Sequence, residues 1–251
     1  MNSEQSTSPI YRLIDQGSRK ELITAEGIQG FFVAPDQTPP NDVTFTKVHT
    51  FHQTRKKTED TDLEILNYRQ EKIGEYYIGP TSLNTPAPHT GSAECTSFSY
   101  SFFGYTCEFP RAGEVWLRWA GKDIVEPGEW ATYPVEFHES WLHVVQTAWF
   151  TARRSTIRYG TDAIAHIDGS KTGTRSSFFC ALGEAMNGPG GYFGSNLDAL
   201  IDCLSSTRRA GQELRVAWDN FSSSREKLGE DFVNLAVGIM ERFGVQVTCQ
   251  E

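Results

Sequence analysis

The chain has 251 residues and a formal net charge of −9. This length allows one large domain or two ordinary ones, and either could bury a core without a metal or disulfides. The negative charge disfavours direct binding to nucleic acid or to an anionic membrane, because both are themselves polyanions. An acidic chain of this kind is better suited to binding a basic protein.

The cysteines and the N-terminal sequence indicate a cytoplasmic protein. Five cysteines are widely scattered, and no pair has the spacing of a disulfide framework or a zinc site: Cys95, Cys107, Cys180, Cys203 and Cys249. The first residues lack the basic and apolar segments of a signal peptide, and no apolar run approaches membrane-spanning length. We therefore expect reduced thiols in the cytoplasm and no membrane partner.

The first part of the chain, residues 1–158, is predicted to be an α+β domain that is mainly antiparallel β. After a polar tail, β-rich runs alternate with turns, and the clearest runs are residues 10–14, 43–52, 63–68 and 75–78. Residues 97–109 are rich in aromatic residues, Ser and Thr, which predicts one long strand or a hairpin that turns at Gly104.

A helix is expected to close this first domain. The apolar residues between 139 and 154 follow helical spacing, which predicts an amphipathic helix: Trp141, Val144, Val145, Ala148 and Trp149. Nothing in residues 1–158 resembles a family that would assign a function. The domain could be an accessory binding surface, a second interaction module or an enzyme, and a deep polar pocket with converging titratable groups would favour the enzyme.

Residues 159–251 are predicted to form an α/β domain. Short apolar runs alternate with segments of helical spacing, and turn-forming residues separate them. The predicted order is a strand at 163–167, helices at 176–186 and 196–206, a strand at 214–218, a helix at 230–242 and a strand at 245–249. Alternation of this kind implies a parallel sheet flanked by helices.

The helix predicted at 196–206 has two distinct faces. Its apolar residues recur at i, i+3, i+4 and i+7 and are expected to face the core: Leu197, Leu200, Ile201 and Leu204. Asp198 and Asp202 lie four residues apart on another face. Both carboxylates are therefore expected to project side by side into solvent.

An ordinary solvated surface could also carry these two carboxylates. Asp198 follows a capping residue, Ser195 or Asn196, closely enough to be favoured by the helix dipole. Asp202 lies too far along the helix for that, and like charges four residues apart cost roughly 0.2 to 0.5 kcal/mol. Because nothing in the helix offsets this repulsion, Asp202 is expected to have a functional role.

Around this helix, the sequence YFGSNLDALIDCL at residues 192–204 closely resembles the signature of the barstar family of ribonuclease inhibitors. The resemblance extends over residues 160–251, because Asp168-Gly169 after the first strand and Trp218 at the end of the next strand also match. It implies a three-stranded parallel sheet and an inhibitor that lays this helix and the preceding loop across the catalytic cleft of a small secreted ribonuclease. No cofactor, metal or small-molecule ligand is expected.

Electrostatics favours the same partner. A ribonuclease needs Arg, Lys and His side chains around the scissile phosphate, so its empty site is a positive pocket. Two carboxylates on one helix face imitate phosphates, and opposite charges accelerate the encounter of two proteins.

The resemblance also implies a set of partner-binding residues: Tyr192, Asn196, Leu197, Asp198, Ala199 and Asp202, with Glu241 as a more distant acidic contact. Structural alternatives stay open for several of them. Tyr192 and Leu197 could be core residues, Asn196 could be a helix cap, and Glu241 could be an ordinary surface acid.

The chain departs from the family pattern at four positions. Ile201 and Thr207 stand where the family archetype has tryptophans, and Arg208-Arg209 stand near one of its acidic loop contacts. The basic pair suggests either an acidic patch on the partner or a solvated loop. These departures leave the identity of the target open.

Other motifs are explained without a site. In FHESWLH, His138 and His143 are five residues apart, whereas a zinc-binding helix needs a separation of four. His49 and His52 lie in a strand-like run and would point to opposite faces. The glycine-rich stretches lack the order of a phosphate loop, and no Ser, Cys or carboxylate forms a recognisable catalytic set. We therefore expect no catalytic residues and no metal site.

The leading hypothesis is a bacterial immunity protein of the toxin–antitoxin kind, which binds and blocks a microbial ribonuclease inside the cell. A second hypothesis keeps the fold but changes the partner to another nuclease toxin or a regulatory protein. A third makes the N-terminal domain an enzyme that the inhibitor-like domain regulates.

Overall fold

The computed structural model describes residues 8–36, 42–53, 55–84, 97–160 and 164–251. The chain divides into two compact units, Met1–Asp123 and Ile124–Glu251, called unit 1 and unit 2 below. Across the described ranges, no helix is both long enough and apolar enough to cross a membrane.

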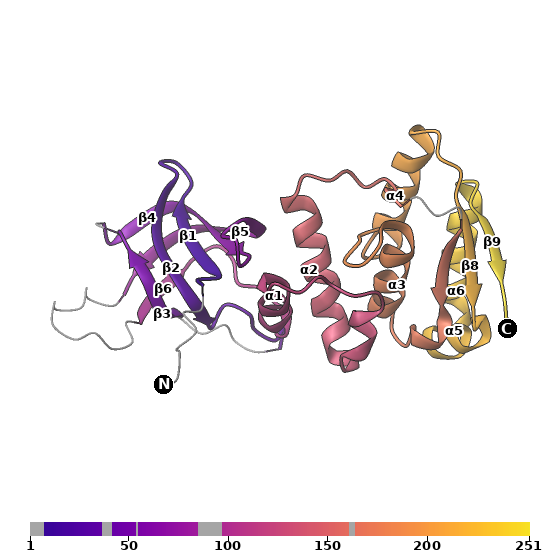
Figure 1. Cartoon of the computed structure of the whole chain (residues 1–251), viewed down its shortest axis with the longest axis horizontal. Coiled ribbons are helices and arrows are strands. Elements are labelled where there is room, and N and C mark those ends of the chain that lie inside the picture. Colours follow the sequence, from indigo (N-terminus) through magenta and orange to yellow (C-terminus); the bar gives the residue numbers. More distant parts are fainter. Residues whose placement is uncertain (1–7, 37–41, 54, 85–96, 161–163) are drawn as a thin grey trace. The chain divides into compact units, whose positions relative to one another are not determined.

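Unit 1 is built on a closed barrel of six antiparallel strands in the order β1-β2-β3-β6-β5-β4 (Figure 1). The barrel closes because β1 pairs with both β2 and β4. The strands are β1 Tyr11–Asp15, β2 Lys20–Gln29, β3 Val43–Phe51, β4 Lys57–Leu66, β5 Lys72–Leu83 and β6 Phe98–Phe102. The prediction of a mainly antiparallel β domain is confirmed.

Two parts of the barrel differ from the sequence prediction. Strand β2 was not predicted, because a register shift between Thr24 and Ala25 breaks the alternation of buried and exposed residues that marks a strand. Residues 97–109 form neither one long strand nor a hairpin at Gly104. Strand β6 ends at Phe102, and a Cβ at Gly104 would lie 2.3 Å from the Ile78 carbonyl oxygen, so this glycine permits a close approach of backbones.

Helix α1, Ala112–Ala120, completes unit 1 by packing an aromatic side chain against the barrel. Trp116 is fully buried and donates a hydrogen bond from Nε1 to the Tyr76 hydroxyl at 2.8 Å. Its ring lies where a Cβ at Gly74 would approach within 2.6 Å, so this position of β5 has no room for a side chain.

Unit 2 contains a three-stranded parallel sheet in the order β7-β8-β9, flanked by helices (Figure 1). Its elements are η1 Glu129–Thr132, η2 Val135–Phe137, α2 His138–Thr151, β7 Ala165–Asp168, η3 Gly169–Lys171, α3 Arg175–Asn187, α4 Leu197–Arg209, β8 Arg215–Asp219, α5 Phe221–Leu228, α6 Glu230–Arg242 and β9 Gln246–Cys249. The parallel α/β prediction is confirmed.

The core of this sheet is aromatic. Trp218 of β8 is fully buried and stacks on Phe178 of α3 with ring centroids 5.0 Å apart. Its Nε1 donates to Ser224 Oγ at 2.9 Å. Ser224 is the buried residue of α5, a short polar helix that the apolar pattern did not predict because its other residues face solvent at least in part.

Helix α2 belongs to unit 2, whereas the sequence predicts that this helix closes the first domain. It packs against α3 and buries Trp141 and Trp149, and its His138 carbonyl accepts a hydrogen bond from Cys180 Sγ at 3.7 Å. The boundary between the units therefore lies between Asp123 and Ile124, whereas the sequence predicts it between residues 158 and 159.

Candidate functional site

The acidic helix α4 begins with a well-formed cap. The Asn196 side-chain oxygen accepts a hydrogen bond from the Ala199 backbone N–H at 2.8 Å. Just before it, Gly194 has a φ of +100°, and a Cβ there would lie 2.9 Å from the Leu200 nitrogen. Only glycine fits this approach, so the turn fixes the direction in which α4 leaves the loop.

The buried face of α4 consists of Leu200, Cys203, Leu204 and Thr207. These residues also have the i, i+3, i+4, i+7 spacing, but the face is rotated from the predicted stripe, since Leu197 and Ile201 are only half-buried. Thr207 can be buried because its hydroxyl donates to the Cys203 carbonyl at 2.9 Å. The predicted core face is therefore correct for Leu200 and Leu204, whereas Leu197 and Ile201 lie at its edge.

Asp198 and Asp202 are both exposed on α4. Within the described ranges, neither carboxylate accepts a hydrogen bond or forms an ion pair. Asp198 lies in the first turn, where the helix dipole favours a negative charge, whereas Asp202 lies one turn further on. The fold thus leaves both carboxylates available, and only Asp198 has a structural reason to be acidic.

The other helix residues of the predicted set lie beside these carboxylates. Leu197 and Ala199 are half-buried and Asn196 is exposed, so each presents part of its surface next to Asp198. Glu241 is exposed near the end of α6, which packs against α4. Whether any of these residues contacts a partner stays a prediction.

Tyr192 has a different environment from the other predicted contacts. Only 2% of its surface is exposed, because its ring packs 5.5 Å from that of Phe150 and 6.3 Å from that of Trp149, both in α2. Burial raises the pKa of its hydroxyl, although a hydrogen bond with Ser195 opposes the shift. Tyr192 is therefore a core residue, whereas its contact with a partner stays a prediction.

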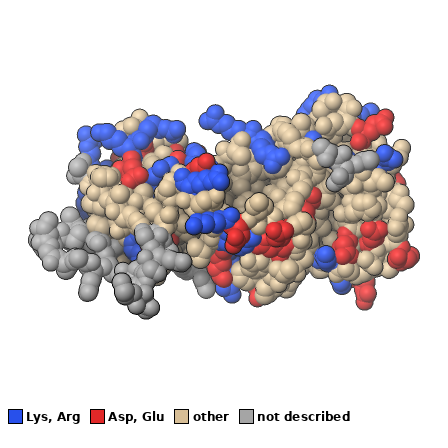
Figure 2. Space-filling view, in the orientation of Figure 1, with Lys and Arg blue, Asp and Glu red and all other residues tan. Residues whose placement is uncertain are grey.

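Arg208 and Arg209 end α4 as exposed residues. Positive charge in the last turn complements the helix dipole, and Arg209 also donates to Ser206 Oγ at 3.1 Å. Figure 2 shows that Asp and Glu side chains gather over unit 2 around α5 as well. Negative charge alone therefore does not single out α4, and the exposed carboxylates of Asp198 and Asp202 indicate a site only together with the fold that carries them.

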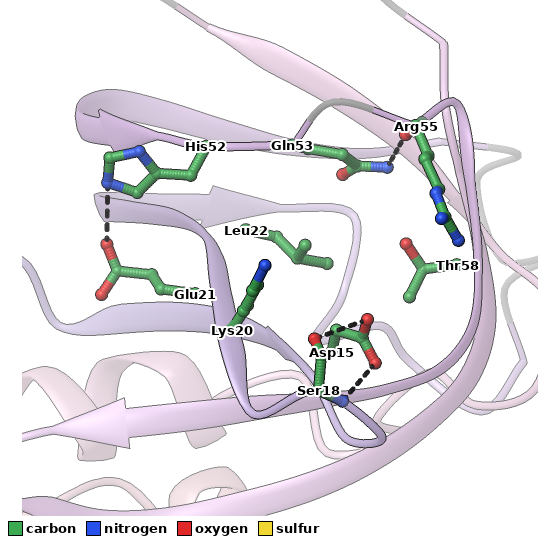
Figure 3. A pocket seen from close by; sticks show the side chains of 9 residues that line it. All are labelled: Asp15, Ser18, Lys20, Glu21, Leu22, His52, Gln53, Arg55 and Thr58. Carbon is green, nitrogen blue, oxygen red and sulfur yellow. Dashed lines mark hydrogen bonds and ion pairs between the residues drawn. The ribbon is translucent and has the colours of Figure 1, made fainter.

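Unit 1 holds a polar cavity of about 500 Å³ at one end of the barrel (Figure 3). Titratable groups from β1, β2 and the segment after β3 converge around it. The lining residues are Asp15, Ser18, Lys20, Glu21, Leu22, His52, Gln53, Arg55 and Thr58. The sequence does not predict this cavity, since its residues come from separate strands and form no motif.

The acids of this cavity are already engaged by neighbours. Burial raises the pKa of Asp15, but hydrogen bonds from Ser18 and Gly17 outweigh this and lower it below its ordinary value. Glu21 accepts from the Thr50 hydroxyl at 2.5 Å and lies 3.9 Å from His52 Nε2 (Figure 3). Among the described lining residues, no hydroxyl is hydrogen-bonded to His52, so the cavity does not join a nucleophile to a base.

Two buried thiols have raised pKa values. Burial raises the pKa of Cys203 to about 12 and that of Cys107 to about 11, so neither forms a thiolate near neutral pH. No group of three or more metal-binding side chains is found in the described ranges of the chain.

The fold and site of unit 2 define a class of protein, a small α/β domain whose three-stranded parallel sheet supports an exposed acidic helix. Residues 163–246 match the family model of barstar (barnase inhibitor), so the chain carries a barstar domain in unit 2. This match confirms the resemblance read from residues 192–204. Residues before 163, including unit 1 and α2, have no family match, and no curated protein matches the chain.

Proposed function

We propose that this chain is an inhibitor of a microbial ribonuclease and that α4 blocks the active site of the enzyme. The observation that supports this proposal is the pair of exposed carboxylates of Asp198 and Asp202 on α4 of a barstar domain, a family described as barnase inhibitors. The partner is expected to present the basic cleft that phosphodiester cleavage requires.

Inhibition follows from charge and shape. Asp198 and Asp202 stand on one helix face, four residues apart, so they can occupy positions that two phosphate groups of an RNA substrate would take. Arg and Lys side chains in a cleft bind carboxylates by charge-assisted hydrogen bonds. The partly exposed side chains of Leu197 and Ala199 add apolar contact beside them.

Asp202 is the stronger candidate of the two acids. Asp198 stabilises the start of α4 through the helix dipole, whereas Asp202 gains little from the dipole and repels Asp198. The Asn196 side-chain oxygen is used by its cap, which leaves its amide N–H groups for a partner. Contacts from Tyr192 and Glu241 belong to the same proposal.

The cellular role follows from inhibition by binding. A cell that makes a toxic ribonuclease survives if a stoichiometric inhibitor is present in its cytoplasm, so we place this chain there as an immunity protein of a bacterial toxin–antitoxin pair. The converging titratable groups of the unit 1 cavity are the observation that favours an enzyme. We nevertheless propose that the chain is not an enzyme, since the carboxylates of Asp15 and Glu21 in this cavity are held by hydrogen bonds from Ser18 and Thr50.

A different nuclease target is the second candidate. Ile201 and Thr207 replace tryptophans of the family archetype, and Tyr192 is covered by α2, so the face around α4 differs from the one that the resemblance implies. These changes favour a nuclease with another surface around its basic cleft.

Inhibition assays on the full chain test the proposal. Ribonuclease activity is measured against increasing amounts of the wild-type protein and of the double variant Asp198→Ala, Asp202→Ala. A matched control, Glu226→Ala with Asp231→Ala, removes two exposed acids from α5 and α6 of the same unit.

The double variant on α4 is expected to lose inhibition by at least about a hundredfold while the control retains it, because truncated acids at an interface centre cost about 2 kcal/mol or more each. Full inhibition by the α4 double variant would refute the site. Failure of the wild-type chain against every guanyl-specific ribonuclease would favour the second target.

A further inference from the structure

A segment outside the family match lies against the barstar domain. We call residues 149–160, the end of α2 and the chain that follows it, the shoulder. Phe150 packs on the ring of Tyr192, and Thr156 Oγ1 donates to Ser206 Oγ on α4 at 3.4 Å. The family match begins only at residue 163, so the shoulder is an addition of this chain next to the acidic helix.

The shoulder is an integral part of unit 2. Trp149 is 2% exposed and donates from Nε1 to the Ser155 carbonyl at 3.0 Å. The Ser155 hydroxyl bonds to the Tyr159 hydroxyl at 2.8 Å, and the Gly160 N–H donates to the Met186 carbonyl at 3.1 Å. Lifting the shoulder away would break the bonds from Gly160 to Met186 and from Thr156 to Ser206 and would expose Trp149, so it stays in place when α4 meets a partner.

Arg154 is the distinctive side chain of the shoulder. Its guanidinium carbon lies 3.8 Å from the ring centroid of Trp149 and 4.7 Å from that of Tyr159. The residue is exposed, and within the described ranges its guanidinium makes no hydrogen bond or ion pair. Stacking therefore holds the planar group while leaving its N–H donors free, which is the arrangement that binds a carboxylate in a bidentate manner.

Two exposed aromatic residues accompany Arg154. Phe150 is 48% exposed and Tyr159 is 45% exposed, whereas Tyr192 beneath Phe150 is 2% exposed. Aromatic and arginine side chains are the types that dominate the energy of protein interfaces. Beside α4, the aromatic surface open to a partner therefore comes from Phe150 and Tyr159 of the shoulder and not from Tyr192.

We propose that the shoulder forms part of the partner-binding surface and that Arg154 binds a carboxylate at the rim of the partner's basic cleft. The inference rests on the proposed function, because the same partner meets Asp198 and Asp202. The combined surface fits a nuclease whose cleft is basic and whose rim carries an acidic side chain. A target without that acid is bound less tightly.

The test measures affinity by calorimetry between the full chain and catalytically inactive forms of several basic microbial ribonucleases, barnase among them. Arg154→Gln removes the charge, and Arg154→Lys keeps the charge but loses the planar fork. Arg153→Gln is the matched control, since Arg153 is the exposed neighbour and stacks on no ring among the described residues. Thermal unfolding checks that each variant is folded.

For the nuclease bound most tightly, Arg154→Gln is expected to weaken affinity at least tenfold and Arg154→Lys by a smaller factor, while Arg153→Gln stays within about twofold. If the α4 double variant loses binding but Arg154→Gln does not, the shoulder proposal is wrong and the proposed function stands. Tighter binding by Phe150→Ala would also overturn it, because the shoulder would then exclude the partner. Failure of the wild-type chain to bind any nuclease would overturn both proposals.

Discussion

Replacing Asp202 by alanine is expected to make the protein more stable. Asp202 is exposed and its carboxylate makes no hydrogen bond or ion pair within the described part of the chain, while Asp198 lies one turn before it. Removing the like-charge pair returns roughly 0.2 to 0.5 kcal/mol. Exchanging Asp for Ala inside a helix adds roughly 0.6 kcal/mol of helix propensity. The free energy of unfolding should therefore rise by about 1 kcal/mol.

Denaturant unfolding followed by far-UV circular dichroism measures this change as a shift in the transition midpoint at constant slope. Asp198→Ala is the internal comparison. That variant relieves the same repulsion and gains the same propensity but loses the favourable interaction of its carboxylate with the helix N-terminus, so it should stay within about 0.5 kcal/mol of wild type. If Asp202→Ala instead destabilises the protein, Asp202 has a structural role that the geometry does not show, and the case for a functional carboxylate fails.

Two further predictions concern unit 2. The pKa of His138 is lowered, mainly by burial, and its Nε2 donates to the Tyr133 carbonyl at 3.2 Å while its buried Nδ1 has no partner among the described residues. As the pH drops below the ordinary histidine pKa of 6.5, His138 takes up a proton in the unfolded chain but not in the folded chain. The free energy of unfolding should therefore fall below that pH. A His138→Gln variant with the same pH profile as the wild type would contradict this prediction. In a Cys95→Ser variant, a thiol reagent at pH 8 should label the exposed Cys249 before the buried thiols. Burial raises the pKa of the Cys203 thiol to about 12, which slows its reaction further. If mass spectrometry finds Cys203 labelled first, α4 opens readily and the prediction is wrong.

Much of unit 2 could be predicted from the sequence, because its signals are local. The order of strands and helices follows from short apolar runs and turn residues, and the parallel sheet follows from their alternation. Asn196 as a cap and the exposure of Asp198 and Asp202 depend only on helical spacing and helix position. The 13-residue stretch at 192–204 was enough to identify the family.

Other features depended on contacts between distant segments. The closure of the unit 1 barrel pairs β1 with β4, and neither strand carries a local sign of its partner. The cavity at its end gathers residues from separate strands, so no spacing in the sequence marks it. Strand β2 was missed because a bulge disrupts its alternation.

The properties of the acidic helix α4 depend partly on the sequence and partly on the tertiary structure. The sequence by itself determined that α4 forms, that it is capped, and that Asp198 and Asp202 share a solvent face, since 3.6 residues per turn fix these relations. Only the tertiary structure decided that Cys203 and Thr207 are buried while Leu197 is partly exposed. It alone placed α2 over Tyr192, because burial is set by whichever element packs on a side chain, and that element lies outside the motif.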